Sequence, residues 1–448
     1  MTVAAIESWH ESLADPVGGE SGEWLHSELA KRGLMFGERP LCTVLRPRFL
    51  SHQQYDTMRR TIRVLLKAFD AALSAALADP KVMDQFHLED WERTLVLEDP
   101  GYEASPLSRL DAFFSDDGEL RFTEYNAETP AGSGYNDALT ELFLALPAMR
   151  DFRRRYVLSP LPARYNVLHS LLRSHRLATG SRDRPTIAIL DWREVPTQSE
   201  FRIFHDYFRS MGFSCLIADP RDTEYRQGAL YAAGTKVDVI YKRVLINELV
   251  KHGGLDHPVV RAVRDRAVCM VNPFRCKVLH KKASLAVLSD ERNQHLYSAD
   301  QRLVIERYVP WTRVVAERRT EIEGREIDLV PFLAANRDQL VLKPNDDYGG
   351  AGVVLGWEAG QTEWESAIRK ALAEPHIVQR RISLPNELFP SLVDGKVVYA
   401  ERIVDTAPMC LEGAFVDSVL TRVSTANLVN VTAGGGSTIP TFLVEPRL

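Results

Sequence analysis

The sequence contains no uninterrupted apolar run of about 18 residues, the length that a membrane-crossing helix needs. Its first residues, MTVAAIESWHESLADP, carry acidic groups early and lack the apolar centre of a secretory signal peptide. These two absences predict a cytoplasmic protein without a membrane partner.

Cysteine is scarce: the 448 residues include five, an odd number without the close spacing of a disulfide framework. One local group, Cys269, Cys276 and His280, has the residue types of a metal–thiolate site. The gap between its two cysteines is too wide for a zinc knuckle, and no second pair follows. The pattern therefore favours a buried strand end over a metal site.

Basic charge is not in excess either, since 55 Lys and Arg stand against 61 Asp and Glu and give a formal charge of −6. This balance argues against a nucleic-acid partner held by bulk electrostatics. Hydrophobic residues make up 45% and charged residues 26%, as in an ordinary globular protein, and the length favours more than one packed lobe.

The periodicity changes along the chain. Residues 1–100 show mostly helical spacing, clearest over YDTMRRTIRVLLKAFDAALSAALADP. Between 185 and 245, the strands TIAIL, SCLIAD and KVDVIYKRV alternate with the helix SEFRIFHDYFRSMG, which predicts a parallel, Rossmann-like sheet. No G-x-G-x-x-G follows the first of these strands, so the pattern gives little support to a dinucleotide site of the NAD type.

The last third of the chain adds two apolar strands, QLVLKP at 339–344 and HIVQRRI at 376–382. From Met409 onward only five residues are charged. A segment so poor in charge is expected to pack into a sheet rather than to be disordered.

The segment SRLDAFFSDDGELRFTEYN places polar side chains at strand spacing. Arg109 and Asp111 are two residues apart, as are Glu124 and Asn126, and residues two apart on a strand point to the same face. The SDDGEL part between them has the composition of a hairpin turn. Folding this hairpin would bring Asp111 opposite Glu124 and Asn126, an all-oxygen ligand set that suits Mg²⁺ or Mn²⁺. An ordinary amphipathic hairpin with an acidic rim is the alternative.

The segment LVLKPNDDYGGAGVVLGW delivers Lys343 on a strand and continues into a loop with Gly349, Gly350 and Gly352. Glycines let backbone N–H groups approach phosphate oxygens, and the lysine adds a point charge. The segment lacks the order of a P-loop. It fits a phosphate-binding loop and a plain β-hairpin with a glycine turn equally well.

Three weaker motifs are also compatible with binding of a phosphate-containing ligand. Lys281 and Lys282 open a helix, although a lysine pair alone fits a solvated surface. The strand containing Gln379 fits an adenine-binding edge as well as the edge of any sheet. Near the C-terminal end, a ligand-approaching segment is expected over Arg422, Asn427, Asn430 and Gly434 to Gly436.

Together these motifs resemble the ATP-grasp superfamily, whose members hold ATP between two β-lobes. In the usual order the lysines and the hinge precede the Arg-x-Asp…Glu-x-Asn strands, whereas here those strands come first, at 109–126. This order is similar to that of the circularly permuted ATP-grasp proteins, such as the synthetase domain of glutathionylspermidine synthetase. The segment FTEYNAETP resembles the metal-binding strand of that domain. The resemblance covers roughly residues 100–448 and does not extend to an amidase domain or to the first 100 residues.

The resemblance implies Asp111, Glu124 and Asn126 as ligands of one or two Mg²⁺ ions, and Arg109 as the catalytic residue that steadies a tetrahedral intermediate. The implied ATP-binding residues are Lys282 and Lys343 at the phosphates, Gly349, Gly350 and Gly352 in the covering loop, Gln379 at the adenine hinge, and Arg422.

The implied fold is a mixed α+β and α/β, circularly permuted ATP-grasp fold. Its expected regions are a helical N-terminal region over 1–100, metal-binding strands of the ATP-grasp lobe over 101–150, a Rossmann-like subdomain over 151–270, and ATP-grasp lobes with the lysine–glycine loop and the hinge over 271–448.

The implied activity is that of an ATP- and Mg²⁺-dependent carboxylate–amine ligase, which forms an amide or peptide bond through an acyl phosphate. Two alternatives keep the same ATP site: a phosphotransferase with a hydroxyl acceptor, and a nucleotide-binding scaffold without turnover. The expected partners are a small-molecule or peptide carboxylate, an amine, and a second copy of the chain in a homodimer. The turn over 129–133 is the expected contact for the acyl substrate.

Overall fold

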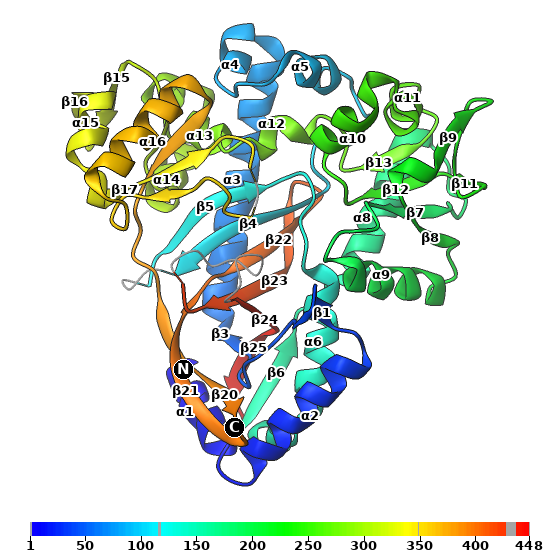
Figure 1. The fold of residues 1–448 in the computed structure, drawn as a ribbon, viewed down its shortest axis with the longest axis vertical. Coiled ribbons are helices and arrows are strands. Elements are labelled where there is room, and N and C mark those ends of the chain that lie inside the picture. Colours follow the sequence, from blue (N-terminus) through cyan, green and yellow to red (C-terminus); the bar gives the residue numbers. More distant parts are fainter. Residues whose placement is uncertain (1, 115–117, 348, 427–435, 448) are drawn as a thin grey trace.

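The structure is a computed structural model that describes residues 2–114, 118–347, 349–426 and 436–447. Several predicted positions lie outside the described residues: Asp116 and Asp117 of the hairpin turn, and Asn427, Asn430, Gly434 and Gly435 of the C-terminal segment. Figure 1 shows how the described elements are arranged.

Helices dominate the first hundred residues, as the periodicity predicts. The longest of them, α3, begins at a capping box in which Ser51 and Gln54 exchange side chain–backbone hydrogen bonds. The helices are α1 (Thr2–Ser12), α2 (Val17–Lys31), α3 (His52–Ala78), α4 (Pro80–Asp84) and α5 (Asp90–Val96). Three short strands interrupt them: β1 (Met35–Phe36), β2 (Arg39–Pro40) and β3 (Arg48–Leu50).

The largest sheet has the strand order β20-β21-β23-β22-β4-β5, with β24 beside β23. Helix α3 crosses behind it (Figure 1), and apolar side chains of both elements form one buried core, in which the rings of Phe69 and Tyr125 lie 4.3 Å apart. The strands are β4 (Leu107–Phe114), β5 (Leu120–Asn126), β20 (Asn386–Val393), β21 (Lys396–Val404), β22 (Ala407–Leu411), β23 (Phe415–Ser424) and β24 (Ser437–Ile439).

A second, four-stranded antiparallel sheet has the order β14-β19-β17-β18. It consists of β14 (Thr312–Val314), β17 (Leu340–Pro344), β18 (Val354–Leu355) and β19 (His376–Arg380), and α15 (Leu329–Ala335) and α16 (Gln361–Ala373) share its core. Both predicted strands are therefore confirmed, and β19 lies inside the sheet rather than at its edge. Residues 381–385 connect β19 to β20, and thus this sheet to the large one.

The predicted parallel sheet is confirmed in the order β13-β12-β7-β8, with β7 (Ile187–Leu190), β8 (Cys215–Ala218), β12 (Val239–Lys242) and β13 (Cys269–Val271). The predicted strand KVDVIYKRV was wrong in extent. It breaks at Asp238, whose carboxylate accepts the N–H of Thr186 at 3.0 Å. Its first part, β11 (Thr235–Val237), instead joins β9 (Thr223–Arg226) and β10 (Ala229–Ala232) in a separate antiparallel sheet.

The described part of the charge-poor C-terminal segment forms strands, as expected. Its last strand, β25 (Thr441–Pro446), lies between β3 and β6 (Tyr156–Pro160), so the two ends of the chain meet in one sheet. The remaining helices and strands are α6 (Ser133–Ala145), α7 (Pro147–Arg155), α8 (Arg164–Thr179), α9 (Gln198–Ser210), α10 (Ile246–Gly253), α11 (Pro258–Arg264), α12 (Cys276–His280), α13 (Ala283–Ser289), α14 (Ala299–Tyr308), β15 (Arg319–Ile322) and β16 (Arg325–Asp328).

Cys269 ends up in β13 and Cys276 at the start of α12, both buried. Among the described residues, no group of three or more His, Cys, Asp or Glu side chains is placed to hold a metal ion. Cys269 therefore lies in a buried strand, whereas Cys276 and His280 lie in a buried helix rather than at a strand end. Within the same part of the chain, no helix is long and apolar enough to cross a membrane.

Candidate functional site

The strand pair β4–β5 has the register that the spacing predicts. Arg109 lies opposite Asn126, and Asp111 lies opposite Glu124. All four side chains line a cleft of about 190 Å³, to which the second sheet also contributes residues. The hairpin therefore brings two carboxylates and an amide to one place.

Nearly all the predicted site residues meet in this cleft. Those that line it are Arg109, Asp111, Glu124, Asn126, Lys282, Lys343, Gly349, Gly350, Gln379 and Arg422. Gly352 is not among the lining residues. Its φ is +68°, and a Cβ added there would come within 2.7 Å of Cγ of Pro344. Glycine is therefore required at 352 by the turn and by its packing on Pro344.

Asp111 sits between two guanidinium groups. It accepts hydrogen bonds from Arg109 at 2.6 and 3.0 Å, and from Arg422 at 2.8 Å. Burial opposes ionisation of this carboxyl, but the two arginines outweigh it and hold the pKa of Asp111 well below its usual range. Arg422 also contacts Asp405 at 2.5 Å. The sequence motifs did not indicate Asp405 as part of this cluster.

Lys343 reaches across to β5. Its ammonium donates to the carbonyl of Thr123 at 3.0 Å and to Oε1 of Gln379 at 2.7 Å. Burial, together with the charge of Lys282, lowers the pKa of Lys343 to about 8, although Glu124 opposes the shift. The amide of Gln379 also donates to Thr312 at 3.0 Å, which fixes its orientation toward the lysine.

Lys282, the residue with the weakest local signal, is part of the same cluster. Its ammonium lies 3.1 Å from Glu124 and donates to the carbonyl of Asp347. Burial raises the pKa of Glu124, but Lys282 and Lys343 outweigh it, so that the pKa of this carboxyl is lowered. Asp111 and Glu124 are thus held in the ionised form that a metal requires.

The donors present fit a magnesium ion. Asp111 and Glu124 carry carboxylate oxygens, which pair here with the neighbouring arginines and with Lys282. Nδ2 of Asn126 is buried without a hydrogen-bond partner. A half-turn of that amide would put its carbonyl oxygen in the same position. Oxygen donors of this kind are the set that Mg²⁺ prefers.

Apolar side chains form another part of the cleft wall, which the motifs in the sequence did not indicate. Val353, Leu355 and Trp357 line it from β18 and its continuation, and Val341 lines it from β17. Their spacing of two residues is a strand signal that lies directly after the glycines. A flat apolar wall beside two lysines can hold a base next to its phosphates.

The turn over 129–133 lies beside Arg109, which donates to the carbonyl of Ala131 at 2.9 Å. The N–H groups of Gly132 and Gly134 donate to Glu200 at 2.7 and 3.1 Å, and Glu200 pairs with Arg243. Glu200 therefore occupies these two donors at the start of α6.

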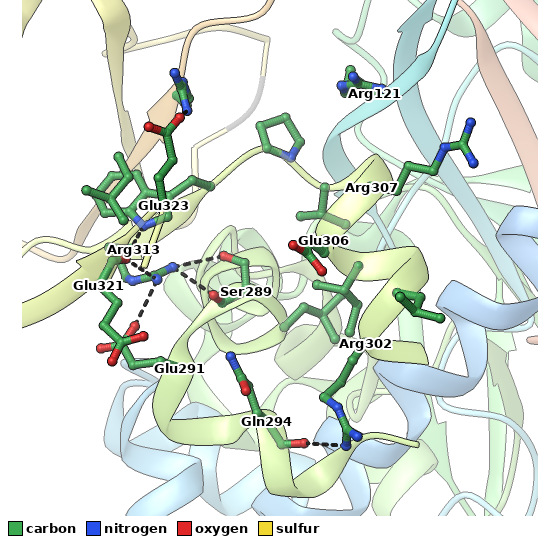
Figure 2. A pocket seen from close by; sticks show the side chains of 18 of the residues that line it. Arg121, Ser289, Glu291, Gln294, Arg302, Glu306, Arg307, Arg313, Glu321 and Glu323 are labelled. Atoms are coloured by element: carbon green, nitrogen blue, oxygen red, sulfur yellow. Dashed lines mark hydrogen bonds and ion pairs between the residues drawn. The ribbon is translucent and has the colours of Figure 1, made fainter. Parts of the chain in front are cut away.

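A larger hollow of about 1070 Å³ adjoins the cleft, because Arg380, Arg381 and Ile382 line both. Figure 2 shows Arg302 and Arg307 of α14 on one side of it and Glu321 and Glu323 on the other. Apart from these three residues, its lining differs from that of the cleft.

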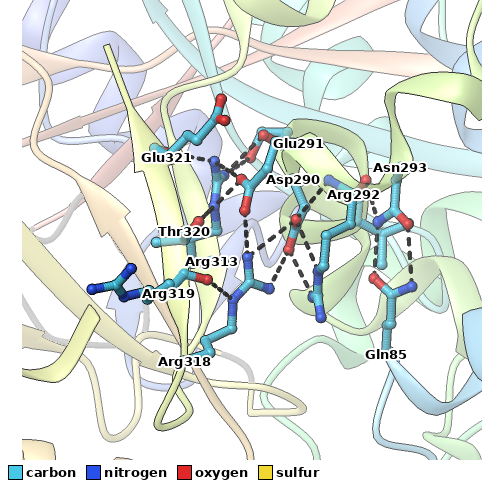
Figure 3. A network of polar contacts seen from close by, with 12 residues as sticks. Gln85, Asp290, Glu291, Arg292, Asn293, Arg313, Arg318, Arg319, Thr320 and Glu321 are labelled. Atoms are coloured by element: carbon cyan, nitrogen blue, oxygen red, sulfur yellow. Dashed lines mark hydrogen bonds and ion pairs between the residues drawn. The ribbon is translucent and has the colours of Figure 1, made fainter. Parts of the chain in front are cut away.

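The wall of this hollow rests on a network of ion pairs (Figure 3). Asp290 contacts Arg292 at 2.8 Å and Arg318 at 2.6 Å, and Glu291 contacts Arg313 at 2.8 Å and Arg318 at 2.7 Å. These contacts tie the end of α13 to β14 and the segment before β15, and so fix the lobe that carries Lys343 and Gln379.

Comparisons with known proteins agree with this architecture. Residues 95–424 match the family described as "Circularly permuted ATP-grasp type 2". A Frankia casuarinae protein named "Putative glutamate--cysteine ligase 2-2" is 26% identical over 92% of the chain, which spans 48%, about half, of that protein's length. An uncharacterized protein of Mycobacterium tuberculosis is 24% identical over 92% of the chain and 75% of its own length.

Among solved structures, a glutathione synthetase-like effector from Globodera pallida, in its apo form, aligns with a TM-score of 0.57. The alignment covers 99% of this chain and 98% of the effector at 11% identity, so it shows a shared fold. The family match covers most of the chain, and within it the carboxylate strand pair precedes the lysines and the hinge. This chain belongs to the circularly permuted ATP-grasp type 2 family.

Proposed function

We propose that this protein is an ATP- and Mg²⁺-dependent ligase that joins a carboxylate to an amine and releases ADP. The observation that carries the proposal is the meeting of Asp111, Glu124, Lys282 and Lys343 in one cleft beside a glycine-rich loop. The Frankia protein is named a glutamate--cysteine ligase and the Globodera effector is described as glutathione synthetase-like, which favours this reaction class.

Each residue has a distinct task in this proposal. Lys282 and Lys343 offset the negative charge of the ATP phosphates, and the loop over 349–352 brings backbone N–H groups to them. Asp111, Glu124 and Asn126 would hold Mg²⁺, which would supply positive charge next to the phosphates during transfer.

The reaction then proceeds in two balanced steps. A carboxylate oxygen of the acid attacks the γ-phosphorus of ATP, so that ADP leaves and an acyl phosphate forms. The amine nitrogen attacks the acyl carbon, loses a proton, and inorganic phosphate departs as the C–O bond breaks. Arg109 lines the cleft next to the carboxylates and would stabilise the oxyanion of the tetrahedral intermediate.

The first test is thermal melting with nucleotide alone, Mg²⁺ alone, and Mg²⁺ with a non-hydrolysable ATP analogue. A ligand at 100 times its dissociation constant adds about 2.7 kcal/mol to the free energy of unfolding, so the melting temperature should rise clearly. We expect the largest rise with metal and analogue together. No rise under any condition would contradict the ATP site.

The second test is release of ADP with panels of small-molecule and peptide acids and amines. A ligase releases ADP rapidly only when acid and amine are both present. ADP release that needs a hydroxyl compound and no amine would identify a phosphotransferase, and nucleotide binding without any ADP release would identify a scaffold.

A further inference from the structure

A group of buried charges lies among residues that do not line the cleft, outside the site described so far. Glu92, Glu128 and Lys277 have almost no exposed side-chain surface, and Asp346 has 24%. Burying charges is unfavourable unless they are paired, so their partners show what the group holds together.

Lys277 contacts all three acids. Its ammonium lies 3.1 Å from Glu128, 2.8 Å from Asp346 and 3.8 Å from Glu92. Burial alone would lower the pKa of this lysine, but the three carboxylates outweigh it and raise the pKa well above its usual range. Lys277 is therefore a permanent cation at the centre of the group.

The two closest acids come from opposite sides of the cleft. Glu128 follows the metal-binding strand, two residues after Asn126, and its other oxygen accepts the N–H of Ile246 at 2.6 Å. Asp346 belongs to the glycine-rich loop, three residues after Lys343. Lys277 thus links the strand that carries the metal ligands to the loop expected to cover the phosphates.

The loop is fastened to the same segment by further bonds. The carbonyl of Asn345 accepts the N–H of Lys282 at 2.9 Å, and its side-chain oxygen accepts the N–H of Ala283 at 2.8 Å. Lys281, four residues after Lys277, contacts Asp346 at 2.9 Å but pairs with Glu92 rather than with Glu128. Of these two lysines, Lys277 is the one that contacts both the strand side and the loop.

We propose that Lys277 is a positioning residue that sets the separation between the metal-binding strand and the glycine-rich loop, through Glu128 on one side and Asp346 on the other. This inference rests on the proposed function, in which the strand and the loop together bind a metal–nucleotide complex. The Glu128–Lys277–Asp346 link would hold the two at the separation that this complex requires. Lys277 touches neither the metal nor the nucleotide in this role.

The test measures how much Mg²⁺ strengthens binding of a non-hydrolysable ATP analogue, by calorimetry with Mg²⁺ and with EDTA. Binding without metal depends on the loop, on Lys282 and Lys343, and on the hinge. Lys277→Met should therefore leave the dissociation constant without metal within about twofold of the wild-type value. The gain from Mg²⁺ should fall at least about tenfold, which is about 1.4 kcal/mol of coupling.

Lys281→Met is the matched comparison, since it makes the same change one helical turn away and keeps the Glu128–Lys277–Asp346 link. It should retain most of the Mg²⁺ gain. If Lys277→Met does not fold, Asp346→Asn provides a milder change that removes the charge of the same link. Asp338→Asn, at an exposed position, is its control. Asp346→Asn should lose the gain, and Asp338→Asn should keep it.

The outcomes separate the two proposals. If the wild-type protein binds no analogue, the proposed function fails and this inference fails with it. If the wild type binds, but the variants lose only melting temperature and keep the Mg²⁺ gain, the cluster balances charge in the core and the positioning role is wrong. Equal loss of the gain in Lys277→Met and Lys281→Met would also overturn it.

Discussion

At the scale of single residues, Lys343 carries the clearest sign of a functional position. Its charge is disfavoured in the cleft, since burial, together with the charge of Lys282, lowers its pKa to about 8. Replacing Lys343 should therefore change the free energy of unfolding little. We expect Lys343→Met to melt at the wild-type temperature or slightly above, and to lose most of the stabilisation by Mg²⁺ and analogue. Protection equal to that of the wild type would contradict its phosphate contact.

Glu124 is the second such residue, because it pairs with Lys282 at 3.1 Å and lines the cleft. If it binds the metal, Glu124→Gln should reduce Mg²⁺-dependent ADP release at least about 100-fold, a loss of several kcal/mol in the transition state. The melting temperature of the unliganded protein should change little. Unchanged turnover in a less stable protein would assign Glu124 a purely structural role.

His280 gives a prediction about pH. It lies 3.8 Å from Glu128, and burial, with a contribution from Lys277, lowers its pKa to about 4 against the opposing effect of Glu128. The unfolded chain binds a proton at this residue near pH ~6.5, whereas the folded chain does not until about pH 4. Stability should therefore fall as the pH drops through this window, by at most about 1.4 kcal/mol per unit. Denaturant titrations at several pH values should show a shallower fall in His280→Gln, and identical slopes would count against the prediction.

At the scale of elements, the three glycines of the glycine-rich loop share a positive φ but differ in their surroundings. Gly349 and Gly350 line the cleft, whereas Gly352 packs against Pro344. Gly352→Ala should reduce the free energy of unfolding by about 1–3 kcal/mol, because alanine is strained at positive φ and would press on Pro344.

The same substitution at Gly360 supplies the control, since its φ is −67° and a Cβ there would meet nothing within 4 Å. Gly360→Ala should unfold at nearly the wild-type denaturant concentration. If the two variants lose stability equally, the strain assigned to Gly352 is absent.

Elements also show which predictions local sequence can make. The register of Asp111 against Glu124 followed from the two-residue period of a strand and a short turn, both local properties. The splitting of KVDVIYKRV did not, because it depends on the contact of Asp238 with distant Thr186. Lys277 and Asp405 were missed for the same reason: each acts through partners far away in the sequence.

At the scale of the whole molecule, the N-terminal helices are part of a core shared with the C-terminal end. Trp9 of α1 is fully buried, donates to the carbonyl of Leu45 at 2.9 Å, and packs edge-on against Phe49 and Phe152. Helical periodicity predicted the helix, but not that β3 would pair with β25 at the other end of the chain.

Trp9→Ala should accordingly lower the free energy of unfolding by about 3–5 kcal/mol, the range for a large aromatic side chain lost from a core. Val3, on the same helix but 65% exposed, serves as the control, and Val3→Ala should stay within about 0.5 kcal/mol of the wild type. Denaturant unfolding measures both, and a small effect of Trp9→Ala would mean that α1 is dispensable to this core.

The order of the strands also has a consequence during synthesis on the ribosome. Strands β4 and β5 emerge long before β22, the strand that pairs with β4 in the finished sheet. A lone two-stranded hairpin is marginal in water, so the nascent pair needs another support while the remaining chain is translated. Helix α3 is made earlier, packs against Tyr125 through Phe69, and shares one buried core with Phe122. Helix α3 can therefore stabilise the nascent β4–β5 hairpin until β22 has been synthesised and pairs with β4.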